Sequence, residues 1–449
     1  MSPLPQARTR RLVGLAGCIA FVATAGYYIF PGLANLWSNS ATAADTDAGA
    51  TLFLHEWEPN DPLAKGDGLG PVYNDRSCVA CHFQGGVGGG GSVEHNVTAF
   101  EIRPSRQNPQ AMSGMVHAAA VEPNALESIS ILQQRFPKIR GSAREVQTNG
   151  CRSVIVIHEI DPVHSQSVNS TALFGAGLVD RIPGSAISSK YRVALGGRGA
   201  GEFDVNLKSV PPGRPRILAD GRVGKFGWKA QAASLQEFVA AACANEIGLG
   251  NPMMAQATPL ACTPTESVPD LDQKQFDSLV TFVDTLPRPE ELVPAEAYHR
   301  AAAHRGKELF GGIGCAICHT PDVGGVTGVY SDFLLHTLES DNDPSQPNPQ
   351  YREDPDDQPL TKHLPKLSEW KTPPLWGVAD SAPYFHDGAS ATLRDAVLRH
   401  GGDAKVVTEA FQRLSNEDQD ALFVFLKTLK APRNARPVVK SNQLAMRGQ

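Results

Sequence analysis

Cys78-Val79-Ala80-Cys81-His82 is the first of two strings that decide the fold, and Cys315-Ala316-Ile317-Cys318-His319 is the second. Each string supplies two thiols at the spacing of the two vinyl groups of a porphyrin, followed at once by an imidazole for the iron. A zinc site or a thioredoxin-like redox pair is the alternative for one such string alone. Two complete strings predict two covalently bound c-type haems, with His82 and His319 as proximal ligands.

The two strings lie in an internal repeat. Gly49-Ala50-Thr51-Leu52-Phe53 precedes the first string, and the similar Gly306-Lys307-Glu308-Leu309-Phe310 precedes the second. Both segments look like the N-terminal helix of a cytochrome c domain. Each half also closes with an apolar helical segment, 279–286 and 422–429, and a nearby proline is a helix stop.

The repeat predicts a mainly α fold with two cytochrome c-type domains. They span residues 45–290 and 296–435, and a polar tail follows over 436–449. The first domain is the longer one because residues 100–220 form an insertion. Its β-branched run Ser153-Val154-Ile155-Val156-Ile157 predicts short β-strands within that insertion.

The N-terminal 44 residues predict export. Arginines precede an uncharged stretch, 12–30, which runs into a small-residue region ending at Ala44. A cleaved signal peptide and a retained membrane anchor are both compatible with this pattern. Either way the body of the protein is expected in the periplasm. The net charge of −6, without a basic block, excludes the electrostatic footprint of a nucleic-acid binder.

The remaining cysteines lie outside the two strings. Cys243 and Cys262 are candidates for a disulfide in an oxidising compartment, although sequence alone leaves the pairing open. Cys151 would then stay unpaired. No paired thiols beyond the haem cysteines support thiol chemistry.

Several further segments carry a resemblance to a known family. They are Gly68-Leu69-Gly70-Pro71, Ala172–Leu178, Gly221–Ala230, Thr372–Val378 and Ser381–Gly388. Together with the two strings, they resemble the di-haem oxidoreductase family, which is related to the bacterial di-haem cytochrome c peroxidases. Thiol oxidation is also ascribed to this family.

The resemblance implies unequal roles for the two haems. The C-terminal haem would take electrons from a donor, and the N-terminal haem would reduce peroxide. Trp228 matches a tryptophan that lies between the haems of the peroxidases, and an indole is suited to pack between porphyrin edges. Glu246 falls near the acidic residue that moves a proton between the peroxide oxygens. The chain departs from the pattern at Phe238, where the peroxidases have glutamine.

The repeat and the resemblance together suggest axial ligands. His400 lies where the peroxidases carry the methionine ligand of their electron-transfer haem, so bis-histidine ligation with His319 is expected there. Trp228 and His386 occupy matching positions of the repeat. His400 lies fourteen residues after His386, and the residue fourteen after Trp228 is Ala242, which cannot bind iron. His95 is close enough to the first string to serve as a displaceable sixth ligand. Histidines of the insertion, His117, His158 and His164, remain open alternatives.

The same resemblance implies a calcium ion held partly by backbone carbonyls of the segment from Ser381 to Pro383, oxygen ligands that suit this cation. The expected partners are a peroxide-type substrate and a small redox protein or quinol-derived donor. A di-haem electron carrier without its own substrate is the alternative function.

Overall fold

The computed structural model describes residues 42–102, 112–148, 152–195, 207–260, 268–338 and 364–438. The described residues from Thr46 onward belong to one compact unit. Outside the described ranges lie the export segment, the end of the tail, Cys151 and Cys262. The Cys243–Cys262 pairing therefore stays a prediction. Within those ranges, no helix has the length and apolarity needed to cross a membrane.

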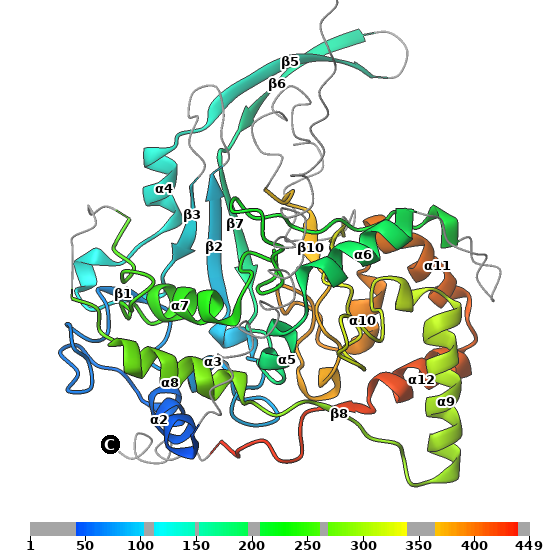
Figure 1. Cartoon of the computed structure of the whole chain (residues 1–449). Helices are drawn as coiled ribbons and strands as arrows, with labels where there is room; N and C mark the ends of the chain where they lie inside the picture. The colour runs from blue at the N-terminus through cyan, green and yellow to red at the C-terminus, as the bar shows by residue number, and fades with distance from the viewer. Residues whose placement is uncertain are drawn as a thin grey trace, which may run out of the picture. The chain divides into compact units, whose positions relative to one another are not determined.

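Helix predominates over strand, as the repeat predicts (Figure 1). The α-helices in the described part of the chain are α2 (Ala43–Leu54), α3 (Cys78–Cys81), α4 (Ile129–Arg135), α5 (Ala176–Asp180), α6 (Gly184–Leu195), α7 (Leu235–Glu246), α8 (Gln273–Asp284), α9 (Ala297–Gly312), α10 (Leu393–Leu398), α11 (Lys405–Arg413) and α12 (Asn416–Leu426). The mainly α prediction is therefore confirmed. The division into two domains stays a prediction.

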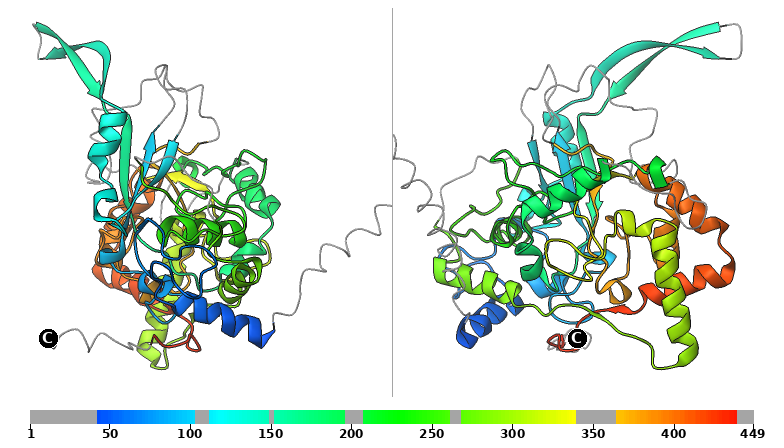
Figure 2. Two further views of the ribbon diagram at one scale, coloured as in Figure 1. Left: turned by 90° about the vertical axis from the view of Figure 1, so that its left-hand side faces the viewer. Right: turned by 45° about the vertical axis from the view of Figure 1, so that its right-hand side comes forward.

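The strands form short antiparallel sheets. They are β1 (Val72–Tyr73), β2 (Val97–Ile102), β3 (Met112–Val116), β4 (Ala119–Ala120), β5 (Ile139–Thr148), β6 (Arg152–Ile160), β7 (Val163–Val168), β8 (Glu290–Glu291), β9 (Leu335–Thr337), β10 (Glu369–Lys371) and β11 (Leu429–Lys430). Among the described residues, the largest sheet has the order β3-β2-β7. Strand β5 pairs with β6 as a separate hairpin, which extends as a two-stranded arm in both views of Figure 2. The β-branched run from Ser153 lies in β6, so the strands expected in the insertion are present.

Both halves bring their first and last helices together at a glycine. A Cβ on Gly49 of α2 would lie 2.0 Å from the carbonyl oxygen of Ser278 in α8, and one on Gly306 of α9 would lie 2.0 Å from that of Ala421 in α12. These distances are too short for any side chain, so only glycine permits the helices to approach this closely. The crossings explain why a glycine stands four residues before Phe53 and Phe310 in the two lead-in segments.

Two buried hydrophobic cores surround these crossings. The larger core contains Phe53, Trp57 and Phe282, and it also takes in Phe333 and Trp376 from the second half. The smaller core belongs wholly to the second half, with residues between Leu309 and Leu429. The two halves thus share apolar packing.

Equivalent capping motifs start two helices that lead to predicted site residues. Ser234 caps α7 and forms a reciprocal capping box with Glu237, while Thr392 caps α10 and does the same with Asp395. Each box satisfies backbone N–H groups that a helix start leaves unpaired. Helix α7 ends at Glu246, and α10 ends just before His400.

The glycine crossing is testable at α9. Gly306→Ala is expected to destabilise the protein by about 1–3 kcal/mol, because the added methyl group overlaps a backbone carbonyl that cannot move freely. Gly311→Ala, in the same helix, has open space around its Cβ and is the matched control. It should change stability by less than about 1 kcal/mol. Equal denaturant midpoints for the two variants would refute the close crossing.

Candidate haem sites

The second string lines an apolar cavity of about 290 Å³. Its wall includes Cys315, Cys318, His319, His400 and Trp228. The attachment thiols, the expected proximal ligand and the expected sixth ligand therefore face one space, although His319 and His400 are 81 residues apart (400 − 319) in the sequence. This donor set fits a haem c.

The two histidines of this cavity present equivalent nitrogen atoms to it. His319 Nδ1 lies 3.1 Å from the Tyr330 carbonyl oxygen, and His400 Nδ1 lies 2.7 Å from that of Ala396. These bonds leave Nε2 of each ring for a ligand. The ring centroids are 6.4 Å apart. Two imidazoles on one metal, each bonded at about 2 Å, have their centroids about 6 Å apart, so the spacing fits an iron between the rings.

Burial favours the neutral form of these rings. It lowers the pKa of His319 to about 4, and it also lowers the pKa of His400. Neutral imidazole is the form that binds a metal ion. Both side chains are therefore ready to bind iron at neutral pH without first losing a proton.

The first string repeats this local geometry. His82 Nδ1 lies 3.1 Å from the Gly89 carbonyl oxygen, and burial lowers the pKa of His82 to about 4. The ring of Phe53 lies 6.4 Å from that of His82, matching the 6.3 Å between Phe310 and His319. Residues Cys78, Cys81 and His82 therefore fit a second haem c.

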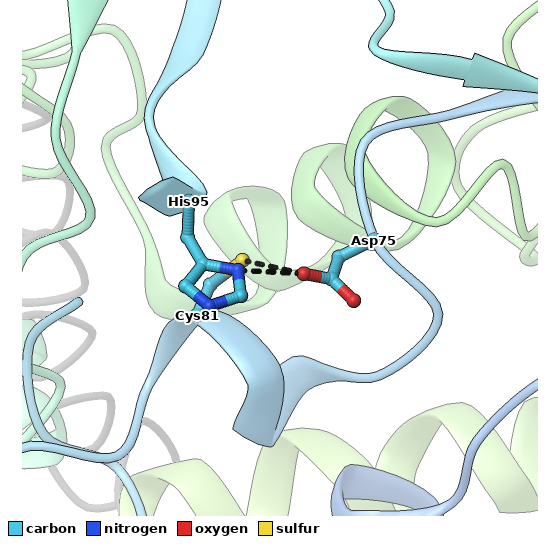
Figure 3. A group of neighbouring side chains, drawn as sticks. All are labelled: Asp75, Cys81 and His95. Atoms are coloured by element: carbon cyan, nitrogen blue, oxygen red, sulfur yellow. Dashed lines mark hydrogen bonds and ion pairs between the residues drawn. The ribbon is translucent and has the colours of Figure 1, made fainter. Parts of the chain in front are cut away.

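His95 lies beside the first attachment site (Figure 3). Its Nδ1 is 2.8 Å from Asp75 Oδ2, and Cys81 Sγ lies 3.8 Å from the same carboxylate oxygen. Carboxylates commonly hold metal-binding histidines in this way. His95 thus lies beside Asp75 and Cys81, with its Nδ1 already hydrogen-bonded.

The second half contains a similar group that the sequence did not reveal. His336 Nε2 lies 2.9 Å from Asp332 Oδ2, and His336 Nδ1 lies 3.7 Å from Cys318 Sγ. His336 and Asp332 are both nearly fully buried. In each half, an aspartate–histidine pair therefore lies against the second cysteine of the string. Haem attachment would occupy that sulfur, so we assign both pairs to the haem surroundings.

Glu246 lies beside the first attachment site, at the end of α7. Its Oε2 accepts a hydrogen bond of 2.7 Å from Asn74 Nδ2, and its carbonyl oxygen accepts one of 2.7 Å from the Asn74 N–H. Burial raises the pKa of Glu246 to about 7, against the opposing effects of Asn74 and His117. The carboxyl can therefore hold or release a proton near neutral pH.

A buried histidine–glutamate pair adjoins Glu246 and was not foreseen as a pair. His117 Nδ1 lies 2.7 Å from Glu127 Oε2, and both side chains are buried. Its Nε2 is also buried and has no hydrogen-bond partner among the described residues. Asn74 links the two groups, because its Oδ1 accepts from the N–H of Ala118, next to His117. Neither pairing nor burial was visible in the local sequence.

Trp228 belongs to a row of rings at the C-terminal cavity. Its Nε1 donates a hydrogen bond of 2.8 Å to the Asn169 carbonyl oxygen. His386 lies edge-on to Trp228 at 6.3 Å between centroids, and Trp370 stacks on His386 at 3.5 Å. All three rings line the cavity.

The segment expected to hold calcium meets the first half of the chain. The Ala382 carbonyl, between Ser381 and Pro383, accepts a hydrogen bond from Gln84 Nε2. Gln84 Oε1 is buried and has no hydrogen-bond partner in the described part of the chain. An unpaired buried oxygen beside a backbone carbonyl is a suitable pair of ligands for a hard cation.

These two sites define the class of the chain: a protein built to bind two haems through Cys-x-x-Cys-His strings. The model of one family, described as "Di-haem oxidoreductase, putative peroxidase", matches residues 145–429. The chain belongs to this family of enzymes. The match includes the second string, Trp228, Glu246 and His400, while the first string precedes it.

Comparison with solved structures finds more distant similarities. Hydrazine synthase of Kuenenia stuttgartiensis, pressurised with xenon, is 17% identical over 59% of this chain and 73% of its own, with a TM-score of 0.33. A MauG-like protein associated with microbial copper homeostasis is 18% identical over 57% of this chain and 89% of its own, with a TM-score of 0.30. No curated protein matches the sequence.

The raised pKa of Glu246 predicts how its replacement affects stability. The folded protein holds this proton up to about pH 7, whereas the unfolded chain releases it near pH 4.5, so ionisation increasingly opposes folding across that interval. Glu246→Gln removes this penalty. The variant should gain stability relative to wild type between pH 4.5 and 7, reaching about 3 kcal/mol, and gain no more above pH 7.

Urea unfolding of wild type and variant at several pH values measures this difference. Glu409→Gln removes the same charge from an exposed position of α11 and is the control. A stability difference for Glu246→Gln that does not change with pH would show that Glu246 ionises normally.

Proposed function

We propose that the chain reduces a peroxide at the N-terminal haem with electrons relayed through the C-terminal haem. The observation that carries this proposal is the inequality of the two sites. The rings of His319 and His400 face each other at the spacing expected for two imidazoles on one iron. Among the described residues, the ring of His82 contacts the ring of Phe53 and no imidazole ring. The N-terminal site instead has the carboxyl group of Glu246, with a pKa of about 7.

The bound haem would supply the iron at which a peroxide O–O bond is broken and would deliver the electrons. Glu246 would accept a proton from one peroxide oxygen and donate it to the other as the bond breaks, which is general acid–base catalysis. Asn74 Nδ2 donates a hydrogen bond to this carboxyl, and the Asn74 N–H donates one to the backbone carbonyl of Glu246. Asn74 therefore acts as a positioning residue.

Trp228 would carry electrons from the C-terminal haem towards the N-terminal one. Its place in the cavity wall with Cys315 and His319 supports this role, and the hydrogen bond to Asn169 fixes the indole plane. His400 would close the C-terminal iron as sixth ligand, so that this haem transfers electrons without binding substrate. His95, held by Asp75, would be the displaceable ligand of the N-terminal iron.

A di-haem electron carrier without its own substrate is the second candidate. The Asp75–His95 pair favours it, because a permanent bond from His95 would close the N-terminal iron as well. In either case we propose a periplasmic location, with a small redox protein or a quinol-derived donor supplying electrons. We also propose a calcium ion at Gln84 and the Ser381–Pro383 carbonyls, whose removal by a chelator would be detected by metal analysis.

Glu246→Gln tests the enzyme directly. The variant should reduce hydrogen peroxide more slowly by a factor of roughly 10²–10⁴, the usual contribution of a general acid–base group. Its haem spectra should match those of wild type. Glu409→Gln should retain the full rate. If Glu246→Gln has the wild-type rate, Glu246 takes no part in the reaction.

His400→Ala tests the assignment of the two haems by low-temperature EPR. Loss of the sixth ligand should convert the signal of the C-terminal haem from low-spin to high-spin and leave the other signal unchanged. His400→Met should retain a low-spin haem and raise its reduction potential, because a thioether ligand favours ferrous iron. His304→Ala, at an exposed position of α9, is the control. Both irons remaining low-spin in half-reduced wild type would support the electron carrier.

A further inference from the structure

Lys371 is a buried cation in the wall of the C-terminal cavity. It is the last residue of β10, which pairs with β9, and its residue exposure is 6%. The same wall contains His319 and His400. Lysine is rarely buried to this extent unless an anion accompanies it.

The described part of the chain supplies no such anion. Lys371 Nζ lies 3.5 Å from the Thr372 carbonyl oxygen, a weak contact, and 5.5 Å from the centroid of the Phe333 ring. None of the described carboxylates forms a salt bridge with it. Asp332 acts on it at longer range, but the two carboxylate oxygens of Asp332 already accept hydrogen bonds of 2.9 Å from Leu334 N–H and from His336.

Neighbouring cations do have partners, which makes Lys371 distinctive. Arg214 binds both carboxylate oxygens of Glu369, at 2.8 and 2.6 Å, and Arg399 binds Asp387 at 2.9 Å. Burial lowers the pKa of Lys371 to about 8, with Asp332 opposing the shift, so the side chain is still mostly charged at pH 7. A charged group in this position requires an anion that enters with a ligand.

Trp370, the residue before Lys371 in β10, carries a second unpaired group in the cavity wall. Trp370 is 2% exposed, its Nε1 has no hydrogen-bond partner among the described residues, and its ring also lines the cavity. An ammonium group and an indole N–H are both donors, and neither can serve as an acceptor. Together they suit a carboxylate.

We propose that Lys371 is the counter-ion of a propionate carboxylate of the C-terminal haem, with Trp370 Nε1 as a further hydrogen-bond donor in the wall of the same cavity. This inference rests on haem attachment at Cys315, Cys318 and His319, and does not depend on peroxide chemistry. Lys371 would be a positioning residue that helps to hold the haem in the cavity whose wall contains His319 and His400.

Resonance Raman spectroscopy of the two-haem protein tests the ion pair, because the propionate bending band responds to hydrogen bonding at the carboxylate. Lys371→Met should shift the component that belongs to one of the two haems. Lys371→Arg should retain the band close to its wild-type position, since it retains a cation. Lys405→Met removes the same charge from an exposed position of α11 and should shift nothing.

An unshifted propionate band in Lys371→Met would overturn the proposal. A crystal structure of the wild-type two-haem protein gives an independent answer that does not depend on how the variants fold. Nζ within hydrogen-bond distance of a propionate oxygen supports the ion pair, and Nζ bonded elsewhere refutes it. A haem count below two by pyridine haemochrome would show that the attachment itself has failed, whereas missing peroxidase activity with two haems present would leave the Raman test valid.

Discussion

The close crossing of the first and last helices of each half is the constraint on which the rest of the structure depends. Gly49 in α2 meets α8, and Gly306 in α9 meets α12, at distances that exclude a Cβ. Phe53 and Phe310, one helical turn later, then lie against the rings of His82 and His319. The crossings thus set where each phenylalanine contacts its expected proximal histidine. The sequence around each histidine does not determine this position, because the crossing partner lies far away in the chain.

From this common framework the two halves diverge. The capping boxes of α7 and α10 start both helices in the same way, yet α7 is longer and ends in Glu246, while α10 stops just before His400. A carboxyl group with a raised pKa suits proton transfer, whereas a neutral imidazole suits binding to an iron. The different residues at the ends of these two helices are therefore the basis on which we propose unequal roles for the two haems.

Burial controls the chemistry of the polar groups around both sites. His117 and Lys371 are buried ionisable side chains, and burial also raises the pKa of Glu246. The three side chains differ in their partners. Glu246 is hydrogen-bonded by Asn74, and His117 is paired with Glu127. Lys371 has no carboxylate within ion-pair distance in the described part of the chain, and a haem propionate is the anion that the proposed cofactor would bring.

The sequence by itself determined the attachment strings, the repeat, the family and the mainly helical fold, because covalent haem attachment requires fixed residue types at fixed spacing. The resemblance to the di-haem peroxidases also indicated Glu246 and His400, and the internal repeat supported His400. Only the tertiary structure decided that His336 pairs with Asp332, that His117 pairs with Glu127, and that Lys371 is buried. Desolvation and pairing depend on segments distant in the chain, and no local pattern of residues records them.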